Sequence, residues 1–240
     1  MCNLYSIRTS RAALARKFML SDNRMAAFEP LPAIFPGHMA PIIRQSADGE
    51  RELVLRSWGF ILLRDGYAPK RVTNTRDDKV ETKFWKDSFA HRRCLVPATA
   101  FCEPDEGKPA RWHWFALKAD EPRPLFAFAG SYRQWKGPIK KAGPNVDIEV
   151  FSFKTTLPNA LTSTINHERS PVLLASEAES ASGCPARRRR RSASSRRPIP
   201  SGCTSCSRGS TRRISSRPPS GRIRADLPCR WDQVACTNSF

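Results

Sequence analysis

The amino-acid composition changes abruptly near residue 180, and this break limits what the chain can fold into. Residues 180–240 hold 14 Arg, no Lys and two acidic residues, a net charge of +12, which leaves +7 of the total +19 for residues 1–179. Few side chains after the break are aliphatic. Such a composition buries too little apolar area to offset the entropy lost on folding. We therefore predict one folded domain over residues 1–179 and a tail over 180–240 that is disordered or encoded out of frame.

Three hypotheses explain the tail. The run of five arginines at 187–191 is typical of a basic arm that binds nucleic acid. A zinc site built on Cys203-x-x-Cys206 is a weaker hypothesis, because no second Cys/His pair stands at a matching spacing. A slipped reading frame is the third hypothesis, because GC-rich DNA read out of register yields Arg, Ser, Pro, Cys and Gly. We favour the slipped frame, since Lys disappears at the junction.

The sequence indicates a soluble protein of a reducing compartment. No run of apolar residues approaches the roughly 18 that a membrane-spanning helix needs. The start of the chain lacks the basic and apolar regions of a signal peptide. No GxGxxG, P-loop or HExxH motif occurs, so we expect no cofactor and no metal. The excess of basic residues favours a polyanionic partner such as nucleic acid.

Within residues 1–179, short segments of strand character outnumber helices. Apolar and alternating patterns predict strands at 53–58, 125–129, 148–153 and 172–174, with short helices at 11–19 and around 85–89. The proline-rich stretch 30–41 is expected to be irregular. Several strands separated by short helices favour an α+β fold with a mixed, curved, barrel-like sheet rather than a doubly wound one.

Cys2 directly follows the initiator Met1. Removal of the methionine would leave a free amine and a thiol on one residue, with pKa values near about 8 and about 8.5. Such a 1,2-aminothiol condenses with an aldehyde: the amine forms an imine, and the thiol closes it to a thiazolidine ring. Position alone does not distinguish this role from that of an ordinary second residue.

Three further motifs carry polar residues that suit chemistry. Asn74-x-Arg76 follows an expected strand, an apolar run from Arg93 leads into Glu103, and His167 stands just ahead of a buried strand. Taken singly, each is ambiguous, because such residues are also common in turns and on surfaces.

Together the motifs resemble the SOS-response-associated peptidase (SRAP) family of abasic-site processing proteins, over roughly residues 1–174. The matching motifs are Met1-Cys2, Trp58-Gly59, Asn74-x-Arg76, Arg93-Cys94-Leu95-Val96-Pro97 with Phe101-x-Glu103, and His167-x-Arg169-x-Pro171-Val172. The resemblance implies self-cleavage that removes the initiator methionine. It also implies a covalent trap for abasic sites in single-stranded DNA, in a monomeric bacterial protein of the cytoplasm that joins the nucleoid when bound to DNA.

The resemblance also assigns roles. Cys2 would capture the ring-opened deoxyribose, and Asn74, Glu103 and His167 would complete the catalytic set. In that set Glu103 would protonate the ring oxygen, His167 would shuttle a proton, and Asn74 would orient the amine. Arg76 would suit a phosphate and Trp58 a stacked base; the alternatives are a surface salt-bridge partner for Arg76 and a core aromatic for Trp58.

An alternative function is a non-catalytic basic protein that binds single-stranded nucleic acid by charge. The chain departs from the family at Asn3-Leu4, where many members have Gly-Arg, and after Ser180, where members continue with a helix and a further strand. It could therefore be an inactive, truncated member. A hydrolase with an N-terminal nucleophile ranks lower, because no motif defines a peptide pocket.

Overall fold

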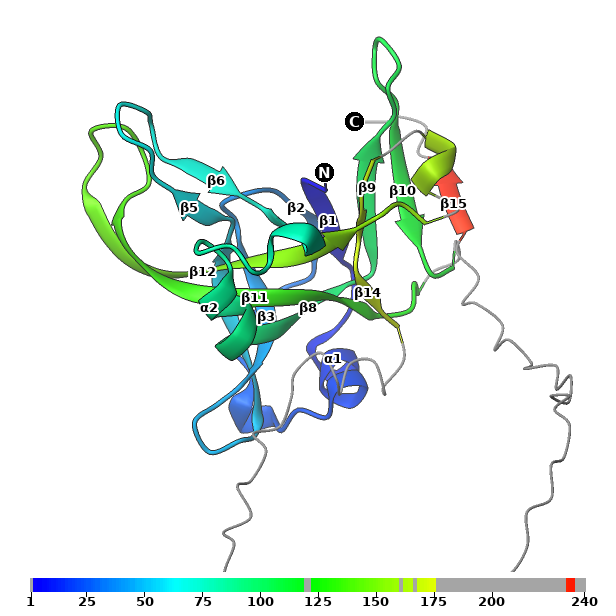
Figure 1. Ribbon diagram of the computed structural model, residues 1–240. Helices are drawn as coiled ribbons and strands as arrows, with labels where there is room; N and C mark the ends of the chain where they lie inside the picture. Colours follow the sequence, from blue (N-terminus) through cyan, green and yellow to red (C-terminus); the bar gives the residue numbers. More distant parts are fainter. Residues whose placement is uncertain (1, 119–121, 160–161, 166–167, 176–231, 236–240) are drawn as a thin grey trace, which may run out of the picture. The chain divides into compact units, whose positions relative to one another are not determined.

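The computed structural model describes residues 2–118, 122–159, 162–165, 168–175 and 232–235, all within one compact unit (Figure 1). The strands are β1 (Leu4–Ile7), β2 (Leu31–Ile34), β3 (Met39–Gln45), β4 (Arg51–Trp58), β5 (Phe60–Leu62), β6 (Lys70–Val72), β7 (Asn74–Arg76), β8 (Arg93–Ala98), β9 (Ala100–Pro104), β10 (Trp112–Ala116), β11 (Phe126–Pro138), β12 (Asn145–Thr156), β13 (Ser170–Pro171), β14 (Leu173–Leu174) and β15 (Asp232–Ala235). The helices are α1 (Arg11–Phe18) and α2 (Lys86–His91), with 3-10 turns η1 (Asp22–Arg24), η2 (Asp77–Lys79) and η3 (Thr162–Ile165).

Five strands close into a barrel. Going round it, β12 pairs with β4, β4 with β3, β3 with β8, β8 with β11, and β11 again with β12. The β12–β4 contact is parallel and the others are antiparallel, so the sheet is mixed. Closure removes the free edges that an open sheet would expose. The predicted mixed, curved, barrel-like sheet with short helices is confirmed.

The chain passes from the barrel into a second sheet at Thr99, between β8 and β9. Its strand order is β15-β10-β9-β1-β2. In it β1 runs antiparallel to β9, with Leu4 opposite Cys102. This pairing brings the start of the chain to the strand that bears Glu103. The strand β15 comes from the segment 180–240 and pairs with β10; the rest of that segment lies outside the described residues.

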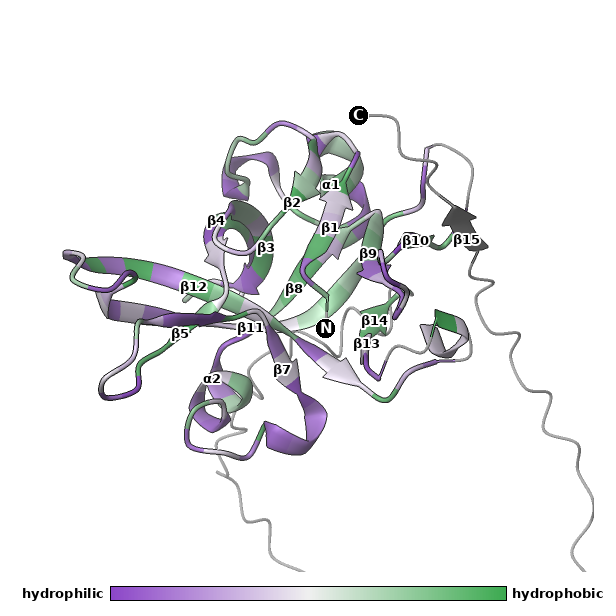
Figure 2. Ribbon diagram, turned by 90° about the horizontal axis from the view of Figure 1, so that it is seen from above, coloured by the Kyte–Doolittle hydropathy of each residue, from purple (hydrophilic) through white to green (hydrophobic). Residues whose placement is uncertain are grey.

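Aromatic rings fill the interior where the two sheets meet. The ring of Tyr5 packs edge-on against Trp58, with 5.0 Å between centroids, and Phe128 stacks on Phe153 at 4.4 Å. All four side chains are fully buried. Figure 2 shows the same distribution as apolar colour on central strands such as β3, and polar colour around α2. Aromatic packing of this kind supplies much of a small core's stability.

The predicted helix over 11–19 is α1. Ser10 caps it, since its side chain accepts a hydrogen bond from Ala13 N, and the helix ends where Met19 takes a left-handed conformation (φ 53°). Leu14 and Phe18 are its buried residues. The helix expected around 85–89 is α2, which begins one residue later than Trp85.

The predicted strands are present, two of them much longer than expected. The strand 125–129 continues to Pro138, because β11 pairs with β12 as a long ribbon that ends with Pro138 opposite Asn145. The strand 148–153 runs from Asn145 to Thr156, where its end pairs with β7 and β13. The expectation of an irregular 30–41 stretch was wrong in part, since it contains β2 and the start of β3. Pro32 is compatible with β2 because β2 is an edge strand.

Candidate active site

Cys2 is a fully buried residue just ahead of β1. Its Sγ lies 3.4 Å from the carbonyl oxygen of Leu4 and 4.0 Å from that of Cys102. Burial raises the pKa of the thiol well above its usual value, and the carboxyl of Glu103 raises it further. The thiol is therefore protonated at neutral pH in this environment.

Asn74 reaches Cys2 from the neighbouring strand β7. Its Nδ2 donates hydrogen bonds to the carbonyl oxygen of Cys2 at 2.8 Å and to Thr73 Oγ1 at 2.7 Å. The side chain is almost fully buried, and its Oδ1 has no hydrogen-bond partner among the described residues. A buried acceptor without a partner is costly, so it suggests a group that arrives during function.

Glu103 completes the described part of the site from β9. Side chains alternate between the two faces of a strand, so Glu103 points to the same face of β9 as Phe101 and to the opposite face from Cys102. The ring of Phe101 stacks on Phe115 in the interior. The side chain of Glu103 is fully buried and lies close enough to Cys2 to raise the pKa of its thiol. The structure thus brings together Cys2, Asn74 and Glu103, from three separate stretches of sequence.

Trp58 takes the core alternative rather than the base-stacking one. Its ring is fully buried and stacks on Phe153, so it presents no face to a DNA base. Its indole Nε1 instead donates a hydrogen bond to the carbonyl oxygen of Thr73 at 3.1 Å, and Ser152 Oγ donates to the same oxygen at 2.9 Å. Trp58 is therefore a core residue that holds the backbone next to Asn74.

Arg76 lies at the end of β7, two residues beyond Asn74. Its guanidinium is about half exposed and pairs with the Asp78 carboxylate through two contacts of 2.9 Å. An exposed pair of this kind contributes little to stability, so a phosphate could replace the carboxylate. The assignment of Arg76 to a phosphate stays a prediction.

His167 lies outside the described residues, but the segment that follows it is anchored. The Arg169 side chain is nearly buried, and its guanidinium pairs with Asp77 and donates to the carbonyl oxygen of Thr155 at 2.9 Å. Thr156 Oγ1 donates to the other oxygen of Asp77 at 2.7 Å. Asp77 directly follows β7, so this ion pair joins the segment after His167 to the strand that carries Asn74.

The pH dependence of stability tests this anchor. Hydrogen bonds from Thr156 and Arg169 lower the pKa of Asp77 to about 2, below the value of about 3.9 expected in an unfolded chain. A depressed pKa stabilises the fold above pH ~4, and the contribution is lost as the pH falls toward 2. Urea unfolding should therefore show Asp77→Asn less stable than the wild type at pH 7, with the gap narrowing at pH 3.

The exposed neighbour Asp78 offers a matched control. Asp78→Asn removes only a surface ion pair, so its unfolding midpoint should stay close to that of the wild type at both pH values. An Asp77→Asn deficit that does not change between pH 7 and pH 3 would contradict the account.

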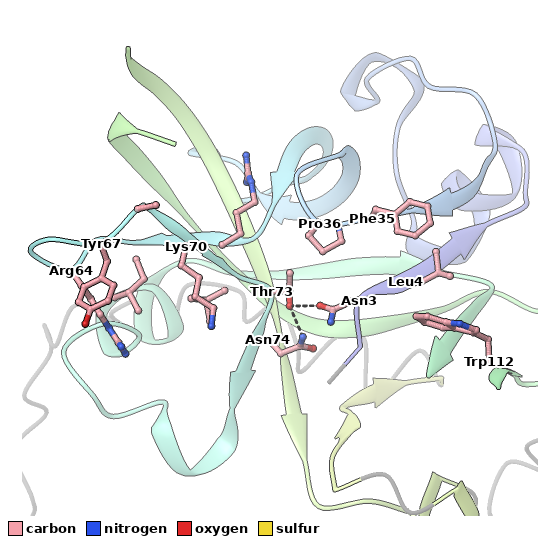
Figure 3. A pocket seen from close by; sticks show the side chains of 14 residues that line it. Asn3, Leu4, Phe35, Pro36, Arg64, Tyr67, Lys70, Thr73, Asn74 and Trp112 are labelled. Carbon is pink, nitrogen blue, oxygen red and sulfur yellow. Dashed lines mark hydrogen bonds between the residues drawn. The ribbon is translucent and has the colours of Figure 1, made fainter. Parts of the chain in front are cut away.

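A cleft of about 1050 Å³ opens beside the site (Figure 3). Its lining includes Asn3, Thr73 and Asn74 in the middle, Arg64, Tyr67, Lys70 and Arg71 from the β5–β6 hairpin, and Leu4, Phe35, Pro36 and Trp112 on the other side. Among the described residues that line it, none is acidic. Three of its aromatic side chains are well exposed: Phe35 (45%), Tyr67 (76%) and Trp112 (48%).

Apart from Asn74, the residues that line the cleft were not identified as functional from the sequence. One signal was present, since Arg64, Tyr67, Lys70 and Arg71 put bases and an aromatic residue close together in the chain. Phe35 and Trp112 join them only through the fold. The described residues contain no group of three or more His, Cys, Asp or Glu side chains placed to hold a metal ion, and none of their helices is long and apolar enough to cross a membrane.

Comparison with known proteins identifies the family. The sequence profile described as SOS response associated peptidase (SRAP) matches residues 1–196. The chain belongs to the SRAP family. Membership associates it with the SOS response and so with DNA damage. The SRAP match extends beyond the predicted domain end at residue 179. A search among curated proteins gives no match.

Solved structures share the SRAP fold. A crystal structure of a protein from Bordetella bronchiseptica aligns with a TM-score of 0.57 at 21% identity, covering 75% of this chain and 86% of the other. A protein from Bacteroides thetaiotaomicron gives 0.56 at 21% identity, covering 78% and 82%. A phage-related protein from B. bronchiseptica gives 0.53 at 19% identity, covering 75% and 80%. At these identities the likeness concerns the fold alone.

Proposed function

We propose that this SRAP protein traps abasic sites in single-stranded DNA as a covalent thiazolidine on Cys2, after self-processing removes Met1. The observation that carries the proposal is the convergence of Cys2, Asn74 and Glu103 beside a basic, aromatic cleft. Family membership supports a role in the response to DNA damage. It does not by itself specify the reaction.

The raised pKa of the Cys2 thiol supports an order of steps. A protonated thiol is a poor nucleophile, whereas an α-amine with a pKa near about 8 is partly neutral at physiological pH. The amine therefore adds first to the aldehyde carbon, and the resulting carbinolamine loses water to give an imine. The sulfur then adds to the imine carbon, and its proton passes to the nitrogen. One water molecule leaves overall.

The neighbouring residues suit the other proton transfers. A closed abasic sugar offers an aldehyde only after its ring opens, and we assign to Glu103 the proton that the ring oxygen needs. Asn74 donates a hydrogen bond to the Cys2 carbonyl oxygen. The unpartnered Oδ1 of Asn74 is available to the amine of Cys2. We assign His167 a second proton transfer on the basis of the family motif.

The cleft supports single-stranded DNA as the partner. Exposed aromatic rings such as Tyr67 and Trp112 can stack on unpaired bases, and the cations Arg64, Lys70 and Arg71 can neutralise phosphates. Bases in a duplex are already stacked and would not reach the rings. The same features favour a second candidate function, binding of single-stranded nucleic acid without chemistry.

Varying the DNA separates the two candidates. We would mix the wild-type protein with three oligonucleotides of one sequence: one undamaged, one with an abasic site, and one whose abasic aldehyde has been reduced to an alcohol. The proposal predicts a band that survives heat and denaturant with the abasic DNA alone, and that changes little with salt once formed. Salt-sensitive binding to all three oligonucleotides, without a heat-stable band, would support binding without chemistry.

A further inference from the structure

A short chain of hydrogen bonds links the exposed side chain of Asn3 to the reactive residue (Figure 3). Thr73 Oγ1 donates to Asn3 Oδ1 at 3.0 Å, and Asn74 Nδ2 donates to Thr73 Oγ1 at 2.7 Å. The second proton on Asn74 Nδ2 goes to the carbonyl oxygen of Cys2 at 2.8 Å. Asn3 and Thr73 are 70 residues apart in sequence.

The direction of these bonds decides which way the Asn74 amide faces. A hydroxyl group has one proton, so the Thr73 hydroxyl that donates to Asn3 presents a lone pair to Asn74. That lone pair accepts from Nδ2 and would repel Oδ1. Without Asn3 as acceptor, the hydroxyl could turn and donate to Oδ1 of a flipped amide, which would then lose its bond to Cys2.

The backbone of Thr73 is fixed independently of its hydroxyl. Trp58 Nε1 and Ser152 Oγ both donate to its carbonyl oxygen, and Thr73 is itself almost fully buried. With its backbone held and its β-branched side chain buried, rotation of the hydroxyl proton is the change that needs the least rearrangement. Asn3, by contrast, is exposed and contributes nothing to the core.

We propose that Asn3 and Thr73 are positioning residues that hold the Asn74 amide so that Oδ1 faces the amine of Cys2. The inference rests on the proposed function and adds the source of the amide orientation. The amine nitrogen and the carbonyl oxygen of Cys2 are only three bonds apart, so an amide that holds the carbonyl lies beside the amine. The buried, unpartnered Oδ1 is the acceptor that this arrangement leaves for it.

We call the hydrogen-bonded chain from Asn3 through Thr73 to Asn74 the relay. Single-turnover crosslinking at saturating abasic DNA tests it. Loss of one neutral hydrogen bond corresponds to roughly a three- to tenfold slower rate, which we expect for Asn3→Ala and for Thr73→Val. Thr73→Ser keeps the hydroxyl and should retain most of the rate. Asn3→Asp keeps the acceptor, so it should retain the saturating rate while its added charge raises the DNA concentration needed for half-saturation. Full rates for Asn3→Ala and Thr73→Val would overturn the proposal.

A double variant shows whether Asn3 and Thr73 affect the crosslinking rate through one pathway or independently. Because Asn3 acts through Thr73, the double variant Asn3→Ala/Thr73→Val should be no slower than Thr73→Val alone. Multiplied losses would contradict a shared pathway.

Hydrogen exchange of the Asn74 side-chain amide, followed by NMR without DNA, gives a readout that needs no catalysis. Both protons should be protected in the wild type, and both should exchange faster in Asn3→Ala, because Nδ2 of a flipped amide bonds neither Cys2 nor Thr73. Equal protection in both proteins would overturn the relay whatever the crosslinking shows. If the wild type forms no crosslink, the proposed function and the positioning role fail together, while the exchange still reports whether Asn3 orients the amide.

Discussion

Cys2→Ala should form no heat-stable crosslink with abasic single-stranded DNA, at any time or protein concentration. The substitution leaves an α-amine that can form an imine, but no sulfur to close the ring. An imine without ring closure is hydrolysed on heating. Because Cys2 is buried and small, alanine fits the site with little change in packing. A denaturing gel measures the result.

Two further variants refine this prediction. Cys2→Ser should give a band only when borohydride is added to reduce the imine, because a hydroxyl closes a much less stable ring than a thiol. Cys94→Ala removes another fully buried cysteine, on β8, and should crosslink like the wild type. A heat-stable band of equal strength from Cys2→Ala and the wild type would contradict the mechanism.

Glu103→Gln should slow crosslinking to abasic DNA by about 10²- to 10⁴-fold, the usual contribution of a positioned acid or base. Once Glu103 has given up its proton, its carboxylate raises the pKa of the Cys2 thiol, and the substitution removes that charge, so the thiol becomes easier to ionise. This second effect favours ring closure. The proton donor acts on the earlier ring-opening step, however, and its loss should dominate.

An open-chain aldehyde distinguishes these steps. An oligonucleotide that carries an alkyl aldehyde in place of the sugar needs no ring opening, so Glu103→Gln should crosslink to it at nearly the wild-type rate. A loss of similar size on both substrates would show that Glu103 acts elsewhere, or that the variant is misfolded. Circular dichroism and the urea midpoint of the variant decide between those two outcomes.

The sequence indicated three of the residues that meet at the site, but not what surrounds them. Cys2, Asn74 and Glu103 were identifiable because their motifs keep the order and spacing of the family. Their approach depends on pairings that no local pattern reports, such as Leu4 with Cys102. The parallel pairing of β12 with β4, which closes the barrel, likewise joins segments far apart in the sequence and leaves no local pattern.

Burial decides between the two alternatives for Trp58. Tryptophan suits both a stacking surface and a core, and the alternating pattern of 53–58 does not say which face of the strand points inward. The structure settles this through the contacts of Trp58 with Phe153 and Thr73. Thr73 and Asn3 were missed as positioning residues for a similar reason, since their hydrogen bond spans 70 residues.

The mass of the crosslinked species tests the central claim most directly. Wild-type protein would be incubated with a short abasic oligonucleotide, heated, and measured intact by mass spectrometry, with the modified peptide then sequenced. The account predicts a protein without Met1, joined to the DNA with loss of one water molecule, and the modification on Cys2. A heat-stable adduct that retains Met1, or one attached to a lysine, would contradict it.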